Sequence, residues 1–504
     1  MSSSISASRR RALVRSGLTE GARRSLVVMA IAAVLAPFIY ILAILFQLGS
    51  WHGADWWLHD IITLRRMLYA DLTRDLPPEA PKNVIVAGSA SLFGVNGGVI
   101  KAATGTETLN FGLHAGLDLD LMLGTASRSI DANDRVIMPL EFEIYPRERP
   151  SDFSAANFLA YFYKDATDIP SGHLPALMAA IHPVTVFEGV LDRIAELFGK
   201  KSSAKLDDSA VKARWLQAQA DPAALQANDS PYDYPDLSAH GDKILVGLTP
   251  PSITADARGF LSAASNQVSL YTARVLDDWR SALAARGASL YLTWPAMLED
   301  DAGTIVTTAH WQMLIDLARE AAAKGQPIYC DPIPAVIPVQ YRYDTAYHVD
   351  HKGQLLYSAG LAACLSDIAA KPFDWKNADA TVLADQARQR LAALKAPPDP
   401  LVFGYERNIR ALQALGKAID AAHAATGLYP DILPAIDATE PVVEIAAAPF
   451  KADYRSNGTD YKLTVAGTSE CFTVREGWPD LIDPHADAPG SCRYGSWSSG
   501  AANW

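Results

Sequence analysis

Short apolar runs and longer segments with apolar residues at helical spacing alternate along residues 83–370. The short runs predict strands at Val84–Ala87, Thr106–Phe111, Arg135–Leu140, Ser289–Thr293 and Pro327–Cys330. The longer segments predict helices at Leu117–Ser129, Gln267–Ala285, Ile305–Ala323 and Gln354–Ala370. Short buried strands separated by helices are typical of a parallel sheet that is covered on both faces. The pattern therefore predicts an α/β domain over residues 83–370.

Residues Ser25–Leu48 form an uncharged, apolar stretch. About 20 apolar residues are enough for a helix to cross a bilayer, so this stretch predicts a transmembrane helix. Arginines dominate residues 1–24, which predicts a cytoplasmic tail and an exported bulk of the chain. A linker over residues 49–82 follows, with tryptophans that suit the far membrane interface: Trp51, Trp56 and Trp57. A cleaved signal peptide is the alternative interpretation.

Residues 145–261 interrupt the alternation of strands and helices. This stretch is rich in proline and holds one clear helical pattern, Val184–Phe198. We interpret it as an insertion into the α/β domain that covers the active face, either as a lid or as a substrate groove. An insertion without a functional role is the alternative.

The pattern changes after residue 370. Residues 371–401 predict a helix at Ala380–Leu394 followed by a stiff, proline-rich linker. Residues 402–504 then predict a separate, small α+β domain. Its expected elements are a helix at Glu406–Thr426 and strands at Val442–Ala446 and Tyr461–Ala466.

Composition excludes some classes of function. The 504-residue chain has a formal net charge of -12, which argues against nucleic acid as a partner because phosphate binding needs clustered Lys and Arg. None of the 4 cysteines has the C-x-x-C spacing of a zinc site, and the sequence predicts neither a metal site nor a cofactor. Cys471 and Cys492 could form a disulfide if their region lies outside the cytoplasm.

Candidate chemistry begins at Ser89, in a turn of small residues that follows the first predicted strand. A serine becomes a nucleophile when a histidine takes its proton and a carboxylate orients that histidine. Asp344 and His348 could supply both groups from one loop after the last predicted strand. A plain turn serine is the alternative interpretation of Ser89, and Ser91 is a weaker nucleophile candidate.

An oxyanion hole would complete this site. Asn110 and Gly112 follow the second predicted strand and should lie on the same sheet edge as Ser89. We therefore expect Ser89, Gly112 and Asn110 to surround the oxyanion. Glu141 and Glu143, after the third predicted strand, are interpreted as ion-pair partners of nearby arginines.

Three blocks resemble the SGNH (GDSL-type) hydrolases: Ala87–Gly94, Asn110–Gly112 and His348–Gly353. They are most similar to the membrane-anchored, exported branch, which includes alginate O-acetylation proteins and D-alanine transfer proteins. The resemblance implies a flavodoxin-like three-layer α/β/α sandwich. It also implies Ser89 as nucleophile, His348 as base and Asp344 as orienting acid.

The C-terminal region resembles the globular head of type II secretion pseudopilins. The blocks that carry this resemblance are Thr426–Pro430, Tyr454–Leu463 and Tyr494–Trp497. It implies a module that binds a glycan or a partner protein. A pilin stem and its processing site are absent from the sequence.

These features together predict a single-pass protein of the bacterial inner membrane with its bulk in the periplasm. The expected activity is transfer of an acyl group, namely acetyl, onto or off an exopolysaccharide through a Ser-His-Asp acyl-enzyme. Transferase and esterase both remain open. A membrane-bound O-acyltransferase or a polysaccharide synthase is an expected partner. The alternative is a non-catalytic envelope scaffold of a polysaccharide synthesis or secretion complex.

Overall fold

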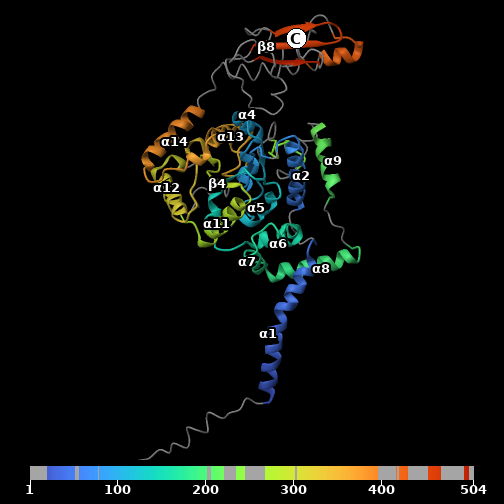
Figure 1. The fold of residues 1–504 in the computed structure, drawn as a ribbon, viewed down its shortest axis with the longest axis vertical. Coiled ribbons are helices and arrows are strands. Elements are labelled where there is room, and N and C mark those ends of the chain that lie inside the picture. The colour runs from blue at the N-terminus through green and yellow to red at the C-terminus, as the bar shows by residue number, and fades with distance from the viewer. Residues whose placement is uncertain are drawn as a thin grey trace, which may run out of the picture. The chain divides into compact units, whose positions relative to one another are not determined.

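A computed structural model describes residues 20–50, 56–77, 79–200, 206–220, 234–244, 267–300, 303–395, 416, 419–429, 452–466 and 493–498 (Figure 1). The chain divides into two compact units. The first unit comprises Met1–His59 and Pro150–Leu206, and the second comprises Asp60–Arg149 and Asp207–Trp504.

The first unit is built on one long helix, α1 (Glu20–Gln47). Its residues Arg24–Gln47 have a mean hydropathy of 2.7 and are long and apolar enough to span a membrane, which agrees with the apolar stretch expected there. Shorter helices complete the unit: α6 (Asp152–Ala160), η2 (Phe162–Asp165), α7 (Leu174–Ala179) and α8 (Pro183–Leu197).

The proline-rich stretch is therefore divided between the two units. Helices α6 and α8 pack with α1, and Gly49 N–H donates to the Leu159 carbonyl at 2.8 Å. The described remainder, residues 207–220 and 234–244, belongs to the second unit. Residues 150–206 therefore interrupt the second unit along the sequence but belong to the first unit.

The second unit contains the predicted parallel sheet. Its strands are β1 (Asn83–Ile85), β2 (Thr108–Asn110), β3 (Arg135–Pro139) and β4 (Ser289–Thr293), in the order β2-β1-β3-β4. All neighbouring pairs are parallel, with Val84 opposite both Leu109 and Val136. The strands are short and almost wholly buried, as is typical of a parallel sheet covered on both faces.

The sheet continues weakly beyond β4. Ile328 forms a single parallel bridge to Leu292, where the sequence predicts a full strand at Pro327–Cys330. A separate parallel pair joins β5 (Met297–Leu298) to β6 (Val336–Ile337). The predicted mixed α/β class with a parallel sheet is confirmed.

Helices surround this sheet. They are α2 (Trp56–Thr73), α3 (Ser89–Gly94), α4 (Gly97–Thr104), α5 (Leu119–Ser127), α9 (Asp208–Ala220), α11 (Leu270–Ala285), α12 (Thr308–Ala323), α13 (His351–Leu365) and α14 (Ala380–Lys395). Short 3-10 helices are η1 (Phe142–Ile144), η5 (Thr304–Val306), η6 (Ile333–Ala335), η7 (Val339–Tyr341) and η8 (Ile368–Ala370). Helix α13 packs against α4, and α11 packs against α5.

Side-chain caps fix where several of these helices begin. Ser269, Thr307 and Asp350 each accept a hydrogen bond from a backbone N–H three residues later, at the starts of α11, α12 and α13. Such caps satisfy a donor that the helix leaves without an intrahelical partner. The predicted helices match the observed ones to within a few residues.

One disulfide lies in the described part of the chain. It joins Cys330 to Cys364, with Cα atoms 5.7 Å apart. The pair suggested from the sequence, Cys471 and Cys492, lies outside the described residues. Cys330 follows the bridge at Ile328, and Cys364 is in α13, so the disulfide ties the end of the sheet to the helix that follows the His348 loop.

The C-terminal region contains a three-stranded antiparallel sheet of β7 (Ala452–Ser456), β8 (Tyr461–Ala466) and β9 (Arg493–Trp497). The strand β8 matches the predicted strand at Tyr461–Ala466. Residues 419–426 are helical and agree with the end of the predicted helix at Glu406–Thr426. The strand predicted at Val442–Ala446 lies outside the described residues.

Candidate active site

Ser89 lies at the carboxyl edge of the sheet, at the start of α3 and directly after β1. It is 9% exposed, whereas Ser91 is fully buried. Gly88 makes the sharp turn possible, because a Cβ there would lie 2.3 Å from Glu141 Oε1 and 2.7 Å from the Ala115 backbone. Ser89 is therefore slightly accessible to solvent, and Ser91 is not.

Asp344 and His348 are brought into contact, as the sequence predicts. His348 Nδ1 lies 2.6 Å from Asp344 Oδ1, and the imidazole is 3% exposed. The loop that carries both residues is closed by backbone hydrogen bonds, from Tyr343 N–H to the His348 carbonyl at 2.8 Å and from Asp350 N–H to the Tyr341 carbonyl at 2.7 Å. The local backbone therefore fixes the pair.

His348 packs against Phe93, in the helix that begins at Ser89. The His348 and Phe93 rings stack, with centroids 4.2 Å apart and planes 20° apart. Phe93 follows Ser89 by four residues in α3, and residues four apart lie on the same helix face. The imidazole therefore lies against α3, on a side chain one helical turn after Ser89. No hydrogen bond joins Ser89 to His348 among the described residues.

Glu141 is a site residue that the sequence interpretation assigned wrongly. Its Oε2 accepts from Gly88 N–H at 3.1 Å and its Oε1 from Ala90 N–H at 2.9 Å, so the carboxyl bonds the backbone on either side of Ser89. Glu141 is fully buried, and no arginine in the described ranges forms an ion pair with it. Burial and then the charge of Glu143 raise the pKa of Glu141 to about 7.

The strand order explains how Glu141 reaches this turn. Glu141 follows β3, which is the neighbour of β1 in the sheet, while β2 lies on the other side of β1. The chain runs from β1 to β2 on one side and from β3 to β4 on the other. Such a switch point creates a crevice at the carboxyl ends of the strands. Ser89 and Glu141 meet at this point. A sequence signal was present, since Glu141 directly follows a predicted strand.

The expected oxyanion donors Asn110 and Gly112 are engaged inside the fold. Asn110 Nδ2 donates to the Ser91 carbonyl at 2.7 Å, and Gly112 N–H donates to Asn110 Oδ1 at 2.8 Å. A Cβ at Gly112 would lie 2.4 Å from Leu92 N, so the glycine allows close contact with α3. Both residues lie beside α3. The Asn110 amide and the Gly112 N–H hold the turn after β2 against this helix, so neither donor is directed at an oxyanion.

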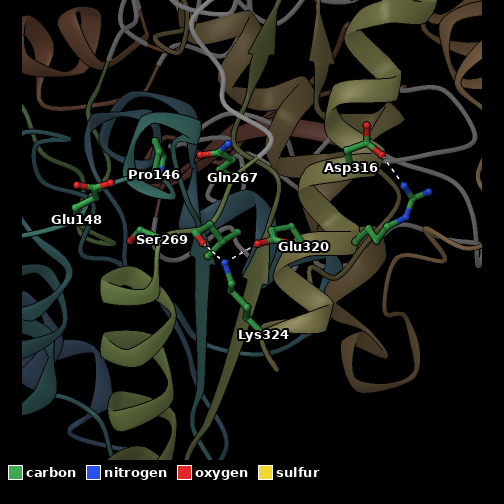
Figure 2. Close-up of a pocket in the computed structure, with 9 residues that line it drawn as sticks. Pro146, Glu148, Gln267, Ser269, Asp316, Glu320 and Lys324 are labelled. Atoms are coloured by element: carbon green, nitrogen blue, oxygen red, sulfur yellow. Dashed lines mark hydrogen bonds and ion pairs between the residues drawn. The ribbon is translucent and has the colours of Figure 1, made fainter.

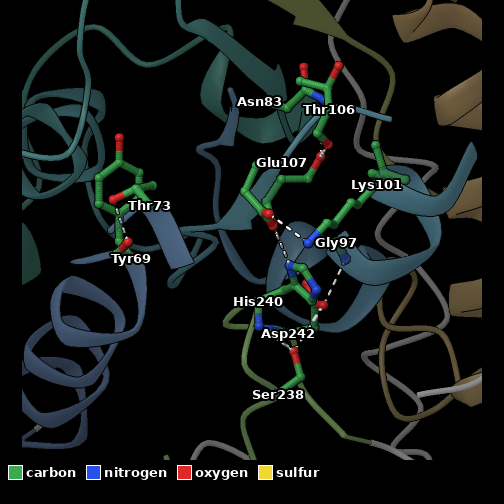
Figure 3. Close-up of polar contacts among 12 residues, drawn as sticks. Tyr69, Thr73, Asn83, Gly97, Lys101, Thr106, Glu107, Ser238, His240 and Asp242 are labelled. Carbon is green, nitrogen blue, oxygen red and sulfur yellow. Dashed lines mark hydrogen bonds and ion pairs between the residues drawn. The ribbon is translucent and has the colours of Figure 1, made fainter. Parts of the chain in front are cut away.

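A buried polar network attaches residues 234–244 to the β2 edge of the sheet (Figure 3). Glu107 lies 2.7 Å from Lys101 Nζ and 3.3 Å from His240 Nδ1, and Asn110 N–H donates to the His240 carbonyl at 2.8 Å. Asp242 Oδ2 accepts from Gly97 N–H at 2.7 Å. These contacts hold the segment next to α3 and α4.

The charges of this network shift each other's ionisation. Burial lowers the pKa of His240, but the contact of its ring with the Glu107 carboxylate and the charge of Asp242 outweigh burial, so the pKa is raised. Burial likewise opposes ionisation of Glu107, yet its hydrogen bonds to His240 and Lys101 leave its pKa lowered. The pair is therefore stabilised in its charged form.

A separate cavity of about 460 Å³ contains none of the predicted site residues (Figure 2). Its lining residues are Pro146, Glu148, Gln267, Val268, Ser269, Asp316, Arg319, Glu320 and Lys324. Arg319 pairs with Asp316 at 2.7 Å and Lys324 with Glu320 at 2.5 Å. Because its cations are paired with neighbouring carboxylates, we do not assign a function to this cavity.

Trp294, at the end of the predicted strand Ser289–Thr293, has a structural role. Trp294 is buried, donates to the Cys330 carbonyl at 2.9 Å and packs edge-on against Phe373, so it belongs to the core. Within the described ranges, no group of three or more His, Cys, Asp or Glu residues is arranged to hold a metal ion.

Comparison of the chain with protein-family models, with curated proteins and with solved structures gives no match.

Proposed function

We propose that this chain is a membrane-anchored serine acyltransferase or acylesterase that acts on an exopolysaccharide. The observation that carries the proposal is the Asp344–His348 pair at 2.6 Å, whose imidazole stacks on Phe93 of α3, the helix that begins at Ser89. The sheet order β2-β1-β3-β4 followed by the Ile328 bridge supports a flavodoxin-like arrangement. The SGNH-like blocks of the sequence are consistent with the same proposal.

The reaction would use the three residues in distinct roles. Ser89 Oγ attacks the acyl carbonyl while His348 Nε2 takes its proton, and Asp344 holds the Nδ1–H of the imidazole. The bond from the acyl carbon to its first carrier breaks, and His348 returns the proton to that carrier. A polysaccharide hydroxyl or water then attacks the acyl-serine and releases Ser89.

The environment of Ser89 sets limits on this mechanism. Gly88 N–H and Ala90 N–H already donate to Glu141, so the backbone N–H of Ser89 is the oxyanion donor that we retain from the predicted set. The raised pKa of Glu141, about 7, keeps its carboxyl largely neutral below that pH. A neutral Glu141 would not repel the developing oxyanion.

Two observations support the proposed location. The apolar helix α1 follows an arginine-rich tail, which favours a cytoplasmic N-terminus and an exported bulk. The Cys330–Cys364 disulfide is of the kind that persists in the bacterial periplasm and is rare in the cytoplasm. We therefore infer a single-pass protein of the inner membrane, and a membrane-bound O-acyltransferase or synthase remains the proposed partner.

The test is covalent labelling of the full chain by a fluorophosphonate probe. We expect wild type and Ser91→Ala to be labelled, because Ser91 is buried, and Ser89→Ala and His348→Ala to be unlabelled. Asp344→Asn should slow labelling by roughly 100-fold or more, since the imidazole loses its orienting partner. Labelling that survives both Ser89→Ala and His348→Ala would refute the proposal.

A non-catalytic scaffold is the second candidate. It is favoured by the engagement of Asn110 and Gly112 within the fold and by the lack, among the described residues, of a hydrogen bond between Ser89 and His348. Catalytic hydrogen bonds are often long before substrate binds, so this geometry alone does not decide. Failure of folded wild-type protein to react with the probe would favour the scaffold.

A further inference from the structure

Helix α8 has a stripe of exposed apolar side chains. Val184 is 53% exposed, Phe187 63%, Leu191 48% and Ile194 39%, and Phe198 directly after the helix is 77% exposed. Their spacing of three and four residues places them on one helix face. A soluble protein rarely leaves so regular an apolar face open to water, so the stripe marks a contact surface.

The opposite face of α8 is attached to α1. Val186 and Gly189 are buried, Gln47 Nε2 donates to the Val186 carbonyl at 3.1 Å, and Ser50 Oγ donates to the Gly189 carbonyl at 3.3 Å. Just before α8, the Ile181 carbonyl accepts from Tyr40 Oη at 2.9 Å. These bonds fix α8 across the C-terminal end of α1 (Figure 1).

The surface of α1 indicates what covers the stripe. Near its C-terminal end Leu42 is 65% exposed, Leu45 56% and Phe46 43%, so the apolar surface of α1 extends to the residues that hold α8. If α1 crosses a bilayer, α8 is fixed at the level of the membrane surface. Its stripe then continues the lipid-facing surface of α1.

The charges of α8 indicate how it would bind. Glu188, Asp192 and Glu196 outnumber Arg193, which pairs with Glu196 at 3.1 Å. A polar face with this acidic balance gives no attraction to anionic lipid. Binding must come from burial of the apolar stripe.

We propose that α8 is an interfacial helix, which lies in the outer surface of the bilayer with its stripe between headgroups and acyl chains. Helices of this kind bury their apolar face about 5–10 Å deep, at the boundary of headgroups and acyl chains. The protein would then be held at the membrane by two elements, α1 and α8, rather than by α1 alone. The inference relies on the membrane span within the proposed function and not on any chemistry at Ser89.

The test places a photo-crosslinking amino acid, benzoylphenylalanine, at single positions of the full chain in phosphatidylcholine vesicles. We expect lipid adducts at Phe187 and Leu191 at least about tenfold more abundant than at Arg193, which lies on the other side of α8. A probe at Val34, 63% exposed in the middle of α1, reports separately whether α1 is in the bilayer. All of these positions are at least partly exposed, so the substitutions should leave the fold intact.

The outcomes separate this inference from the proposed function. A lipid adduct at Val34 without adducts at Phe187 and Leu191 would overturn the inference and leave the membrane span in place. Crosslinks from Phe187 or Leu191 to a second copy of the chain, in place of lipid, would also overturn it. No adduct at Val34 would instead count against the membrane span and hence against both. Enrichment that is unchanged in high salt would support apolar burial as the cause.

Discussion

Glu141 is the residue on which the geometry around Ser89 depends most. Its two carboxyl oxygens accept the N–H groups of Gly88 and Ala90, at 3.1 and 2.9 Å, and thereby fix the turn between β1 and α3. Only a side chain with two acceptor oxygens can satisfy both donors. The same burial that makes these bonds strong also opposes ionisation of the carboxyl.

Glu141→Gln should destabilise the protein by about 1–3 kcal/mol, because the amide NH₂ replaces one acceptor and leaves one buried N–H without a partner. The free energy of unfolding of the full chain in detergent, measured with denaturant at pH 5, tests this. Glu188→Gln is a matched control on an exposed carboxylate and should change stability little. An unchanged stability of Glu141→Gln would show that the two hydrogen bonds are unimportant.

The pH dependence of stability should also change in Glu141→Gln. In the folded protein the pKa of Glu141 is raised from 4.5 to about 7, so the folded state holds a proton that the unfolded state has released. Wild-type stability should therefore fall as pH rises from 4.5 to about 7, by roughly 3 kcal/mol from this group. The difference in the free energy of unfolding between variant and wild type should therefore be smaller at pH 8 than at pH 5. Equal differences at the two pH values would contradict the assignment.

At the scale of elements, residues 234–244 depend on charge for their attachment to the β2 edge. The raised pKa of His240 means that its contribution is fully present below the unfolded value of 6.5 and is lost as pH rises through the folded pKa. The lowered pKa of Glu107 means that its contribution is present above 4.5 and is lost as pH falls through the folded pKa. The attachment should therefore be strongest between pH 4.5 and pH 6.5.

His240→Gln should therefore cost more stability at pH 5.5 than at pH 8.5, by roughly 1–3 kcal/mol, the range for a hydrogen bond between charged groups. Thermal or denaturant unfolding at the two pH values tests this. Lys101→Met removes the other cation bonded to Glu107, at 2.7 Å, and is the matched control. The cost of Lys101→Met should vary less with pH, because lysine side chains ordinarily titrate far above both pH values. A cost of His240→Gln that is the same at both values would contradict the prediction.

The Cys330–Cys364 disulfide should stabilise the element that follows the His348 loop. The two cysteines are 34 residues apart, and closing a loop of this length restricts the unfolded chain by about 3–4 kcal/mol in the chain-entropy treatment. Replacing both cysteines by serine should lower the free energy of unfolding by about that amount. Cys471→Ser combined with Cys492→Ser serves as the comparison and tests whether the terminal cysteines also matter. A double variant at 330 and 364 as stable as wild type would contradict the prediction.

At the scale of the whole molecule, the last helix of the α/β unit (residues 60–149 and 207–395) ends before the C-terminal sheet begins. Helix α14 packs on α12, Arg390 Nη2 donates to the Pro334 carbonyl at 2.8 Å, and Lys395 pairs with Glu299 at 2.6 Å. In the described part of the C-terminal region, the strands β7, β8 and β9 pair with each other. The α/β unit is therefore complete at Lys395, where α14 ends.

A chain that ends after Lys395 should keep the thermal midpoint of the α/β unit and its labelling at Ser89. Measurement of the midpoint and of probe labelling beside the full chain tests this. A chain that ends after Ala370 lacks α14 and is the contrast, because loss of its buried residues Leu383 and Leu391 should lower the midpoint. Loss of folding in the chain that ends at Lys395 would show that the C-terminal region stabilises the unit.

The sequence by itself determined the features that depend on local pattern. The apolar stretch at Ser25–Leu48 and the strand at Ser289–Thr293 are recognisable from neighbouring residues alone, since periodicity and length carry the signal. The contact between Asp344 and His348 is also local, because the two residues are four apart in one loop closed by its own backbone. These predictions needed no knowledge of distant contacts.

Only the tertiary structure decided which distant groups meet. Glu141 accepts hydrogen bonds from the turn around Ser89 because β3 is the neighbour of β1 in the sheet. No local stretch of sequence predicts that strand order. For the same reason the amide of Asn110 binds α3, and Cys330 joins Cys364. Hydrogen bonds and disulfides form between groups that the fold brings within a few ångströms, and sequence separation does not reveal which groups these are.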